Sequence, residues 1–262
     1  MITYNRIGTN GRFGNQMFQY ATLYSIAKTR KYQFGVPYKL KTNNEYYNFC
    51  LPECFSNLSA ADSSDYAALN KAQERQFTYN AGIFGIQDNT DITGYFQSEK
   101  YFVDYREQLL KEFSFNDRIY KQAVDIRSLT RLPTISIHLR LGDYVQLQDN
   151  HPICSLEYYA EALKLLPDDI LIYVFSDDIP EATEFFKSLN RKVVFTESND
   201  KYVDMCLMTL CNYHIIANSS FSWWGSWLSD SKKTIAPSKW FGSAPSAPKN
   251  WSDIYCKEWI IL

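Results

Sequence analysis

Apolar and polar side chains alternate along residues 134–141, and this alternation predicts a β-strand with two different faces. Aliphatic residues occupy every second position, at Ile135, Ile137, Leu139 and Leu141. The positions between them, at Ser136, His138 and Arg140, point to the opposite face. An apolar strand that ends in Arg, Gly and Asp is typical of an anion site at the carboxyl edge of an α/β sheet.

Similar apolar segments recur beyond residue 132, between stretches with helical patterns, which predicts the βα alternation of a parallel sheet. We expect strands over residues 134–139, 170–175, 193–195, 213–217 and 234–236. Polar residues follow four of these strands, at His138 and Arg140, 176–178, 196–198 and 218–220. Because the carboxyl ends of parallel strands meet at one edge of a sheet, these clusters predict a shared binding site.

The N-terminal part of the chain predicts a β-loop-α unit, with a strand over residues 2–7 and a glycine-containing turn over residues 8–14. A helix is expected from about Asn15, because bulky or apolar residues follow at spacings i, i+3, i+4 and i+7: Met17, Tyr20, Ala21 and Tyr24. Patterning then weakens, and we expect a helix near residues 67–75, a strand over 91–97 and a helix over 107–113.

This pattern predicts an α/β fold of two domains, an N-terminal one over residues 1–125 and a C-terminal one over 126–262, joined near residues 120–132. We expect the two halves to face each other across a cleft. The length of 262 residues suits one large domain or two modest ones.

Composition narrows the class of partner. The net charge of −2 and the pI near 6.0 lack the basic footprint of a nucleic-acid or anionic-membrane binder. No apolar run approaches the ~18–20 residues of a membrane span, and no signal segment begins the chain, so we expect a soluble, cytoplasmic protein without stable membrane insertion. The six cysteines are scattered and only three histidines are present, so no metal site is predicted.

Several side chains at the predicted strand ends have two interpretations. Arg140 offers a planar five-donor fork that can grip a diphosphate, or it forms a salt bridge with Asp143. Asp177 and Asp178 can accept hydrogen bonds from a ribose or a purine, or they cap the following helix, which starts with a proline near its first turn. His138 either orients a phosphate or sugar hydroxyl, or is a structural residue.

Two loops also have the composition of phosphate-binding segments. The turn over residues 8–14 places glycines before a helix N-terminus, which can offer backbone N–H groups to a phosphate, although an ordinary tight turn has the same composition. Residues 218–220 place small hydroxyl and amide side chains between a strand and a Trp-rich helix, where backbone N–H and O–H donors can meet an anion.

Six segments together resemble the motif series of the α1,2-fucosyltransferases, in order and along nearly the whole chain. These segments are residues 11–21, 94–98, 138–144, 154–159, 175–178 and 218–225. The resemblance implies a GT-B-like architecture of two Rossmann-like domains, GDP-fucose as the donor and a galactose-type acceptor. It also implies inversion at the fucose anomeric carbon, with no metal or other cofactor.

The resemblance assigns roles residue by residue. Donor binding falls to Gly14, Asn15, Gln16, His138, Arg140, Asp177, Asn218, Ser219, Ser220 and Phe221. Catalytic roles are expected for Arg140, Asp143, His138 and His151. The general base is chosen by position rather than by the resemblance: Asp143 lies at the end of the motif and is the first choice, with His151 or Asp149 in the next loop as the alternatives. Composition alone, rather than the resemblance, suggests the acceptor side: Tyr95 and Gln97 are expected to contact the acceptor sugar or simply to pack, and an acceptor contact is also expected from Asp149.

One position departs from the family pattern, because Leu141 stands where the family has a second arginine. Leu141 faces away from Arg140 on the predicted strand, so we expect its presence to spare the diphosphate clamp. Two alternatives stay open at the level of sequence: transfer of fucose to another acceptor, and a non-catalytic protein that binds a GDP-sugar or a glycan.

Overall fold

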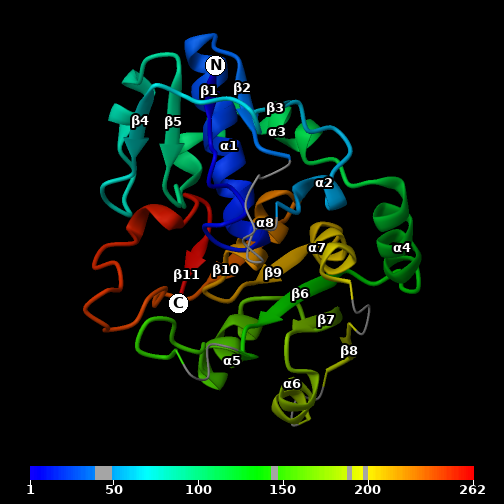
Figure 1. The fold of residues 1–262 in the computed structure, drawn as a ribbon. Coiled ribbons are helices and arrows are strands. Elements are labelled where there is room, and N and C mark those ends of the chain that lie inside the picture. The colour runs from blue at the N-terminus through cyan, green and yellow to red at the C-terminus, as the bar shows by residue number, and fades with distance from the viewer. Residues whose placement is uncertain (39–48, 143–146, 188–190, 197–199) are drawn as a thin grey trace. The chain divides into compact units, whose positions relative to one another are not determined.

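The computed structural model of the chain describes residues 1–38, 49–142, 147–187, 191–196 and 200–262. The chain forms two compact units, each built around its own β-sheet, and the α/β class predicted from the sequence is confirmed. Unit 1 consists of Met1–Asn116 and Asn250–Cys256, and unit 2 of Asp117–Lys249 and Lys257–Leu262. Figure 1 shows the course of the chain through both units.

Unit 1 contains a five-stranded parallel sheet in the order β3-β2-β1-β5-β4. Its strands are β1 (Ile2–Thr3), β2 (Phe34–Val36), β3 (Ala61–Asp62), β4 (Asn70–Gln73) and β5 (Thr90–Thr93). Its helices are α1 (Phe13–Arg30), α2 (Leu51–Cys54) and α3 (Arg106–Glu112), with short 3₁₀ turns η1 (Ala81–Gly85), η2 (Glu99–Tyr101), η3 (Val103–Tyr105) and η5 (Ser252–Ile254).

Helix α1 begins two residues earlier than expected, so that Gly14, Asn15 and Gln16 lie in its first turn. It is buried along most of its length and ends at Lys31, whose left-handed backbone lets its N–H reach the carbonyls of the last turn. The helix expected near residues 67–75 was wrong. Residues 70–73 form the edge strand β4, whose side chains are mostly exposed and therefore show no apolar alternation.

Unit 2 contains a six-stranded parallel sheet in the order β11-β10-β9-β6-β7-β8. Its strands are β6 (Thr134–Leu139), β7 (Leu171–Ser176), β8 (Val193–Phe195), β9 (Tyr213–Ile215), β10 (Lys233–Ala236) and β11 (Ile260–Ile261). Its helices are α4 (Asp117–Arg127), α5 (Leu156–Lys164), α6 (Ile179–Phe186), α7 (Lys201–Thr209) and α8 (Ser220–Trp227). All five strands expected in this half are present, within two residues at each end.

The division between the units differs from the expected boundary at residue 125. That residue falls inside α4, which packs against α7 and is therefore part of unit 2. The segment Asn250–Cys256 returns to unit 1, where Asp253 pairs with Lys100 and accepts a hydrogen bond from the backbone N–H of Tyr79 at 2.8 Å.

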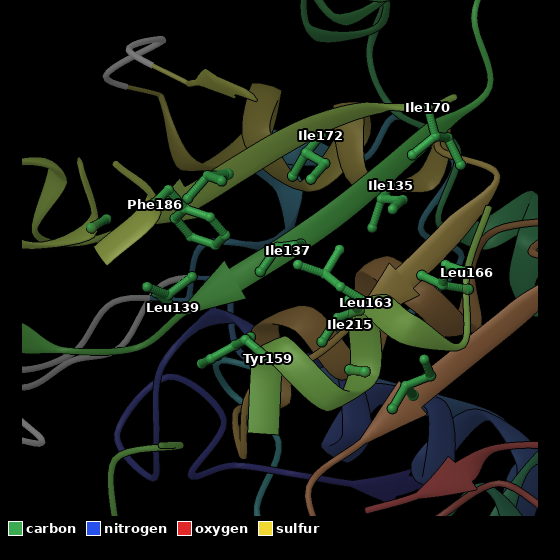
Figure 2. Close-up of a cluster of buried hydrophobic side chains, with 14 residues drawn as sticks. Ile135, Ile137, Leu139, Tyr159, Leu163, Leu166, Ile170, Ile172, Phe186 and Ile215 are labelled. Atoms are coloured by element: carbon green, nitrogen blue, oxygen red, sulfur yellow. The ribbon is translucent and has the colours of Figure 1, made fainter. Parts of the chain in front are cut away.

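The core of unit 2 lies on the aliphatic face of β6, where α5 and α6 cover the sheet. Figure 2 shows Ile135, Ile137 and Leu139 of β6 packed with Tyr159 and Leu163 of α5, in a cluster that also contains residues of β7, β9 and α6. This arrangement confirms the predicted alternation along β6. The opposite face, which carries Ser136 and His138, is also buried, and α8 packs against it through hydrogen bonds.

Candidate functional site

The end of β6 holds Arg140 in an ion pair with Asp177, which follows β7. Nη1 of Arg140 lies 2.5 Å from Oδ2 of Asp177, and Oδ1 of the same carboxylate accepts a hydrogen bond from the Leu141 backbone N–H at 2.9 Å. Both side chains are partly exposed, at 18% and 27%. Neighbouring parallel strands thus bring a cation and a carboxylate together at the carboxyl edge of the sheet, as expected. The alternative partner, Asp143, lies outside the described residues.

The close approach of this carboxylate depends on Gly142. A Cβ atom added at Gly142 would lie 2.3 Å from Oδ2 of Asp177, which is far inside van der Waals contact. A side chain at this position would therefore push the carboxylate away from Arg140.

Asp178 has the structural role that was the alternative in the sequence. Its carboxylate accepts a hydrogen bond from the Glu181 backbone N–H at 3.1 Å and caps the N-terminus of α6. Consecutive aspartates therefore divide two tasks, since Asp178 caps a helix and Asp177 orients Arg140.

His138 is buried on the polar face of β6 and is enclosed from several sides. Its Nδ1 lies 2.9 Å from Oγ of Ser222, its ring centroid lies 5.7 Å from that of Phe221, and its carbonyl accepts a hydrogen bond from the Tyr159 hydroxyl at 2.8 Å. Burial, reinforced by the nearby Arg140, lowers the pKa of His138 to about 4. The imidazole is therefore neutral at pH 7, so it is a weak general base there but can still form hydrogen bonds.

The N-terminus of α8 lies at the end of β9, beside β6 in the sheet. Ser219 is the N-cap, and its side chain accepts a hydrogen bond from the Phe221 backbone N–H at 3.3 Å. The first turn contains no acidic residue, so the positive end of the helix dipole is not offset there. Ser220 and Phe221 follow the cap directly, so the predicted hydroxyl-rich loop is a helix N-terminus next to the strand that carries His138.

Asn218, predicted to contact the donor, is engaged inside unit 2. Its Nδ2 donates to the carbonyls of Pro152 at 2.9 Å and Trp240 at 3.1 Å, and its Oδ1 lies 3.6 Å from Sγ of Cys154. Because both amide hydrogens are used, Asn218 holds two loops beside α8 in this structure and has no side-chain N–H left for a ligand.

Sequence reasoning missed the sheet-facing serines of α8 and the turn that follows it. Ser222, Ser226 and Ser229 are spaced four and three residues apart, and each bonds a side chain of the sheet: His138, Thr234 and His214 respectively. The spacing of these three serines was the available signal, because residues at i, i+4 and i+7 share one face of a helix.

A cavity of about 640 Å³ lies on the other side of β6, within unit 2. Its walls are mainly apolar, and the starts of α5 and α6 add the carboxylates of Glu157, Asp178 and Glu181. The other lining residues are Leu139, Leu141, Ile153, Cys154, Ser155, Leu156 and Tyr159. Leu141 faces this cavity, which agrees with the prediction that it points away from Arg140. The cavity thus combines apolar walls with hydrogen-bond acceptors.

Two of the residues predicted in unit 1 contact each other. Nε2 of Gln97 donates to Oδ1 of Asn15 at 2.6 Å, so the amide expected to meet the acceptor is used inside the unit. Oε1 of Gln16 accepts from the Cys50 backbone N–H at 3.0 Å, and Gly14 is buried beside it in α1. Tyr95, in contrast, is 41% exposed.

Gly11 precedes this helix with a φ of +101°, a conformation that favours glycine, and a Cβ there would lie 2.4 Å from Nδ2 of Asn15. The turn before α1 therefore needs glycine at this position, both for its backbone and for the Asn15 side chain.

The alternative bases are found in a turn of unit 2. The ring centroid of His151 lies 5.6 Å from that of Phe241, and the carbonyl of Asp149 accepts from the Ala244 backbone N–H at 2.8 Å. The carboxylate of Asp149 belongs to an exposed residue. Within the part of the chain that the structure describes, no group of three or more His, Cys, Asp or Glu side chains is arranged to hold a metal ion.

The two buried imidazoles should make the fold sensitive to acid. Burial lowers the pKa of His138 to about 4 and that of His214 to about 3, from 6.5. At pH values between 6.5 and these lowered pKa values, the unfolded chain binds protons that the folded chain does not. The free energy of unfolding therefore falls as the pH drops below 6.5. Each imidazole contributes a slope of up to about 1.4 kcal/mol per pH unit.

Urea unfolding at pH 7.5, 6.0 and 5.0 measures this slope. A His214→Gln variant should lose less stability than the wild type over the same interval, because it lacks one of the two groups, whatever its stability at pH 7.5. Equal losses in the two proteins would contradict the assignment.

The sequence as a whole matches glycosyl transferase family 11 over residues 1–262. The chain belongs to this family. The family 11 protein is 31% identical to an α-1,2-colitosyltransferase of Escherichia coli, over 92% of this chain and 95% of that relative. It is 27% identical to the galactoside 2-α-L-fucosyltransferase SEC1 of Bos taurus, over 85% of this chain and 63% of that longer relative.

Among solved structures, the family 11 protein is similar to the α-1,6-fucosyltransferase NodZ from Bradyrhizobium. The TM-score is 0.58 at 12% identity, over 87% of this chain and 92% of NodZ in a crystal soaked with GDP-fucose. The resemblance predicted from the motifs and the GT-B-like fold class are therefore confirmed. Among the described residues of the family 11 protein, no helix combines the length and apolar character needed to span a bilayer.

Proposed function

We propose that this family 11 protein transfers L-fucose from GDP-β-L-fucose to the 2-hydroxyl of a terminal β-galactoside, with inversion and without a metal ion. The observation that carries the proposal is the anion site of unit 2, in which Arg140, oriented by Asp177, ends the strand beside the N-terminus of α8. A diphosphate matches both the guanidinium fork and the backbone N–H groups of a helix N-terminus.

The cavity beside β6 supports a nucleoside diphosphate as the leaving group. Its volume falls within the roughly 300–1,000 Å³ of small-molecule sites, and it borders Leu139 and Leu141, which flank Arg140 in sequence. A guanine has N–H donors on one edge, which suit the carboxylate of Glu181 on the cavity wall. The nucleoside contact expected of Asp177 from the family motif is part of the same proposal.

The proposed reaction is a direct displacement. The acceptor 2-hydroxyl forms a bond to the fucose anomeric carbon while the bond from that carbon to the β-phosphate oxygen breaks, and the hydroxyl proton passes to the base. Negative charge grows on the departing GDP, so donors aimed at the phosphates stabilise the transition state more than the ground state. Arg140 and the donors around Ser219 and Ser220 would supply this stabilisation.

For the general base we propose Asp143, with His151 and Asp149 as the alternatives in the next loop. The true base should produce the acidic limb of the pH–rate profile, because protonation at low pH removes its function. We expect Asp143→Asn to abolish this limb and His151→Gln to keep it, as measured by kcat between pH 5 and 9. A limb lost only in His151→Gln would move the role to His151.

The similarity to an α-1,2-colitosyltransferase supports colitose as a second candidate for the transferred sugar, and one assay with GDP-linked sugars separates the possibilities. The purified protein is incubated with lactose and either GDP-fucose or GDP-colitose in the presence of EDTA, and both product linkage and GDP release are read. A fucosyl-α1,2-galactose product supports the proposal, and preference for GDP-colitose supports the second donor. GDP release without a product points to another acceptor, and GDP binding without turnover contradicts the transferase proposal.

A further inference from the structure

Ser222 is a buried serine in the first turn of α8, and its hydroxyl has three polar neighbours. Nδ1 of His138 is the nearest at 2.9 Å, whereas the carbonyls of Ser219 and Ala217 are 3.4 Å and 3.5 Å away. Because a hydroxyl has one hydrogen to donate, the short contact to the ring nitrogen is its best acceptor.

A hydrogen bond donated to Nδ1 fixes the protonation pattern of the ring. A neutral imidazole carries its hydrogen on one nitrogen, so an accepting Nδ1 leaves that hydrogen on Nε2. Nε2 has no hydrogen-bond partner among the residues that the structure describes, although the side chain is only 6% exposed. The charged groups nearest the ring are Arg140 and Asp177, both belonging to the anion site.

We propose that Ser222 is a positioning residue that holds His138 in the Nε2–H form, so that a neutral imidazole presents one N–H donor beside Arg140 to the bound nucleotide. This inference rests on the proposed function for the identity of the nucleotide. A neutral donor adds a hydrogen bond to the anion site without placing a second positive charge next to the guanidinium. The opposite tautomer would present a lone pair at Nε2, which repels phosphate oxygens.

The second buried imidazole shows the same protonation pattern with a more fully determined network. Ser229 donates its hydroxyl to the Ser226 carbonyl at 2.6 Å, so it accepts from Nε2–H of His214, at 2.9 Å. Nδ1 of His214 is left to accept the hydroxyl of Ser136 at 2.6 Å. Serines in α8 and at its end therefore face both imidazoles of the sheet, and His214 provides an internal reference for the tautomer of His138.

Nitrogen-15 NMR of protein labelled on histidine tests the proposal directly, since the chain has three histidines and a His138→Gln variant assigns one of them. In the wild type at pH 7, long-range correlations should show His138 with a protonated Nε2 and an unprotonated Nδ1. Ser222→Ala should shift this pattern toward a mixture of tautomers and leave His214 unchanged. A protonated Nδ1 in the wild type, or an unchanged pattern in Ser222→Ala, would overturn the proposal.

Titration calorimetry with GDP adds a functional readout with a matched control. Ser222→Ala should weaken GDP binding by about 5- to 10-fold, the range expected for one lost hydrogen bond, and Ser222→Thr, which keeps the hydroxyl, should restore most of it. Ser226→Ala removes an equally buried serine one turn away, bonded to Thr234, and should leave GDP affinity unchanged. Equal losses in Ser222→Ala and Ser226→Ala would show a general packing effect and overturn the positioning role.

The NMR and activity measurements show whether the positioning role of Ser222 or the proposed function has failed. A protein that transfers neither fucose nor colitose contradicts the function, whereas the NMR pattern reports the tautomer whether or not turnover occurs. The NMR experiment could show Nε2–H on His138 in the wild type while the Ser222→Ala variant transfers fucose with unchanged KM and kcat. This result would contradict the positioning role of Ser222 but not the proposed function.

Discussion

Arg140→Ala is expected to lower kcat for fucosyl transfer by about 100- to 1,000-fold, the loss seen when one donor to a developing negative charge is removed. Arg140 directly follows β6, and its ion pair with Asp177 fixes the orientation of the guanidinium. The Asp177 carboxylate in turn accepts a hydrogen bond from the Leu141 backbone N–H. In the proposed reaction, a hydrogen-bond donor that is already oriented needs no rearrangement as negative charge develops on the leaving GDP. Steady-state rates of GDP release with saturating GDP-fucose and lactose measure the change.

Two further variants identify the cause of that loss. Arg140→Lys keeps the charge but lacks the planar fork, so it should recover part of the rate. Arg118 forms an exposed ion pair with Asp200 in the same unit, and Arg118→Ala should leave kcat within about twofold of the wild type. A folded Arg140→Ala protein with near-normal turnover would remove the anion site from the mechanism.

Five of the six strands of unit 2 could be predicted because each satisfies a local pattern, whereas the two-residue edge strand β11 could not. The bounds of β6 agree with its alternation, since aliphatic residues on one face pack on α5 and α6 while polar ones meet α8. Strand β4 could not be predicted in the same way. It lies at the edge of its sheet with mostly exposed side chains, so no pattern of burial is imposed on its sequence.

Some features of the candidate site could also be predicted from the sequence, whereas others could not. The placement of Arg140, Asp177 and Ser219 at one sheet edge follows from the βα alternation and from the carboxyl-end rule. The order of the strands in the sheet, which makes β7 and β9 the neighbours of β6, was not predicted from the sequence. The internal hydrogen bonds of Asn218 and Gln97 do not follow, because their partners are distant in the chain and are selected by tertiary packing. Ser222 meets His138 for the same reason, from 84 residues away in sequence.

Trp223→Ala is the substitution expected to reduce stability most, by about 3–5 kcal/mol in the free energy of unfolding. The side chain is fully buried. The distance from its ring centroid is 5.0 Å to the ring centroid of Trp224, 6.1 Å to that of Trp227 and 5.5 Å to that of Trp259. Truncation would leave a cavity between α8 and the C-terminal segment. Urea unfolding followed by tryptophan fluorescence suits this test, because Trp251 is the one tryptophan of six outside unit 2.

Trp223→Phe, which keeps part of the aromatic volume, should retain more of this stability than the alanine variant. Leu129→Ala provides the surface control, because that side chain is 84% exposed in the same unit and its loss should change stability by less than about 0.5 kcal/mol. Since Trp223 follows Ser222 directly in α8, a loosened helix should also weaken GDP binding near the unfolding transition. A Trp223→Ala protein as stable as the wild type would show that the aromatic cluster does not anchor α8.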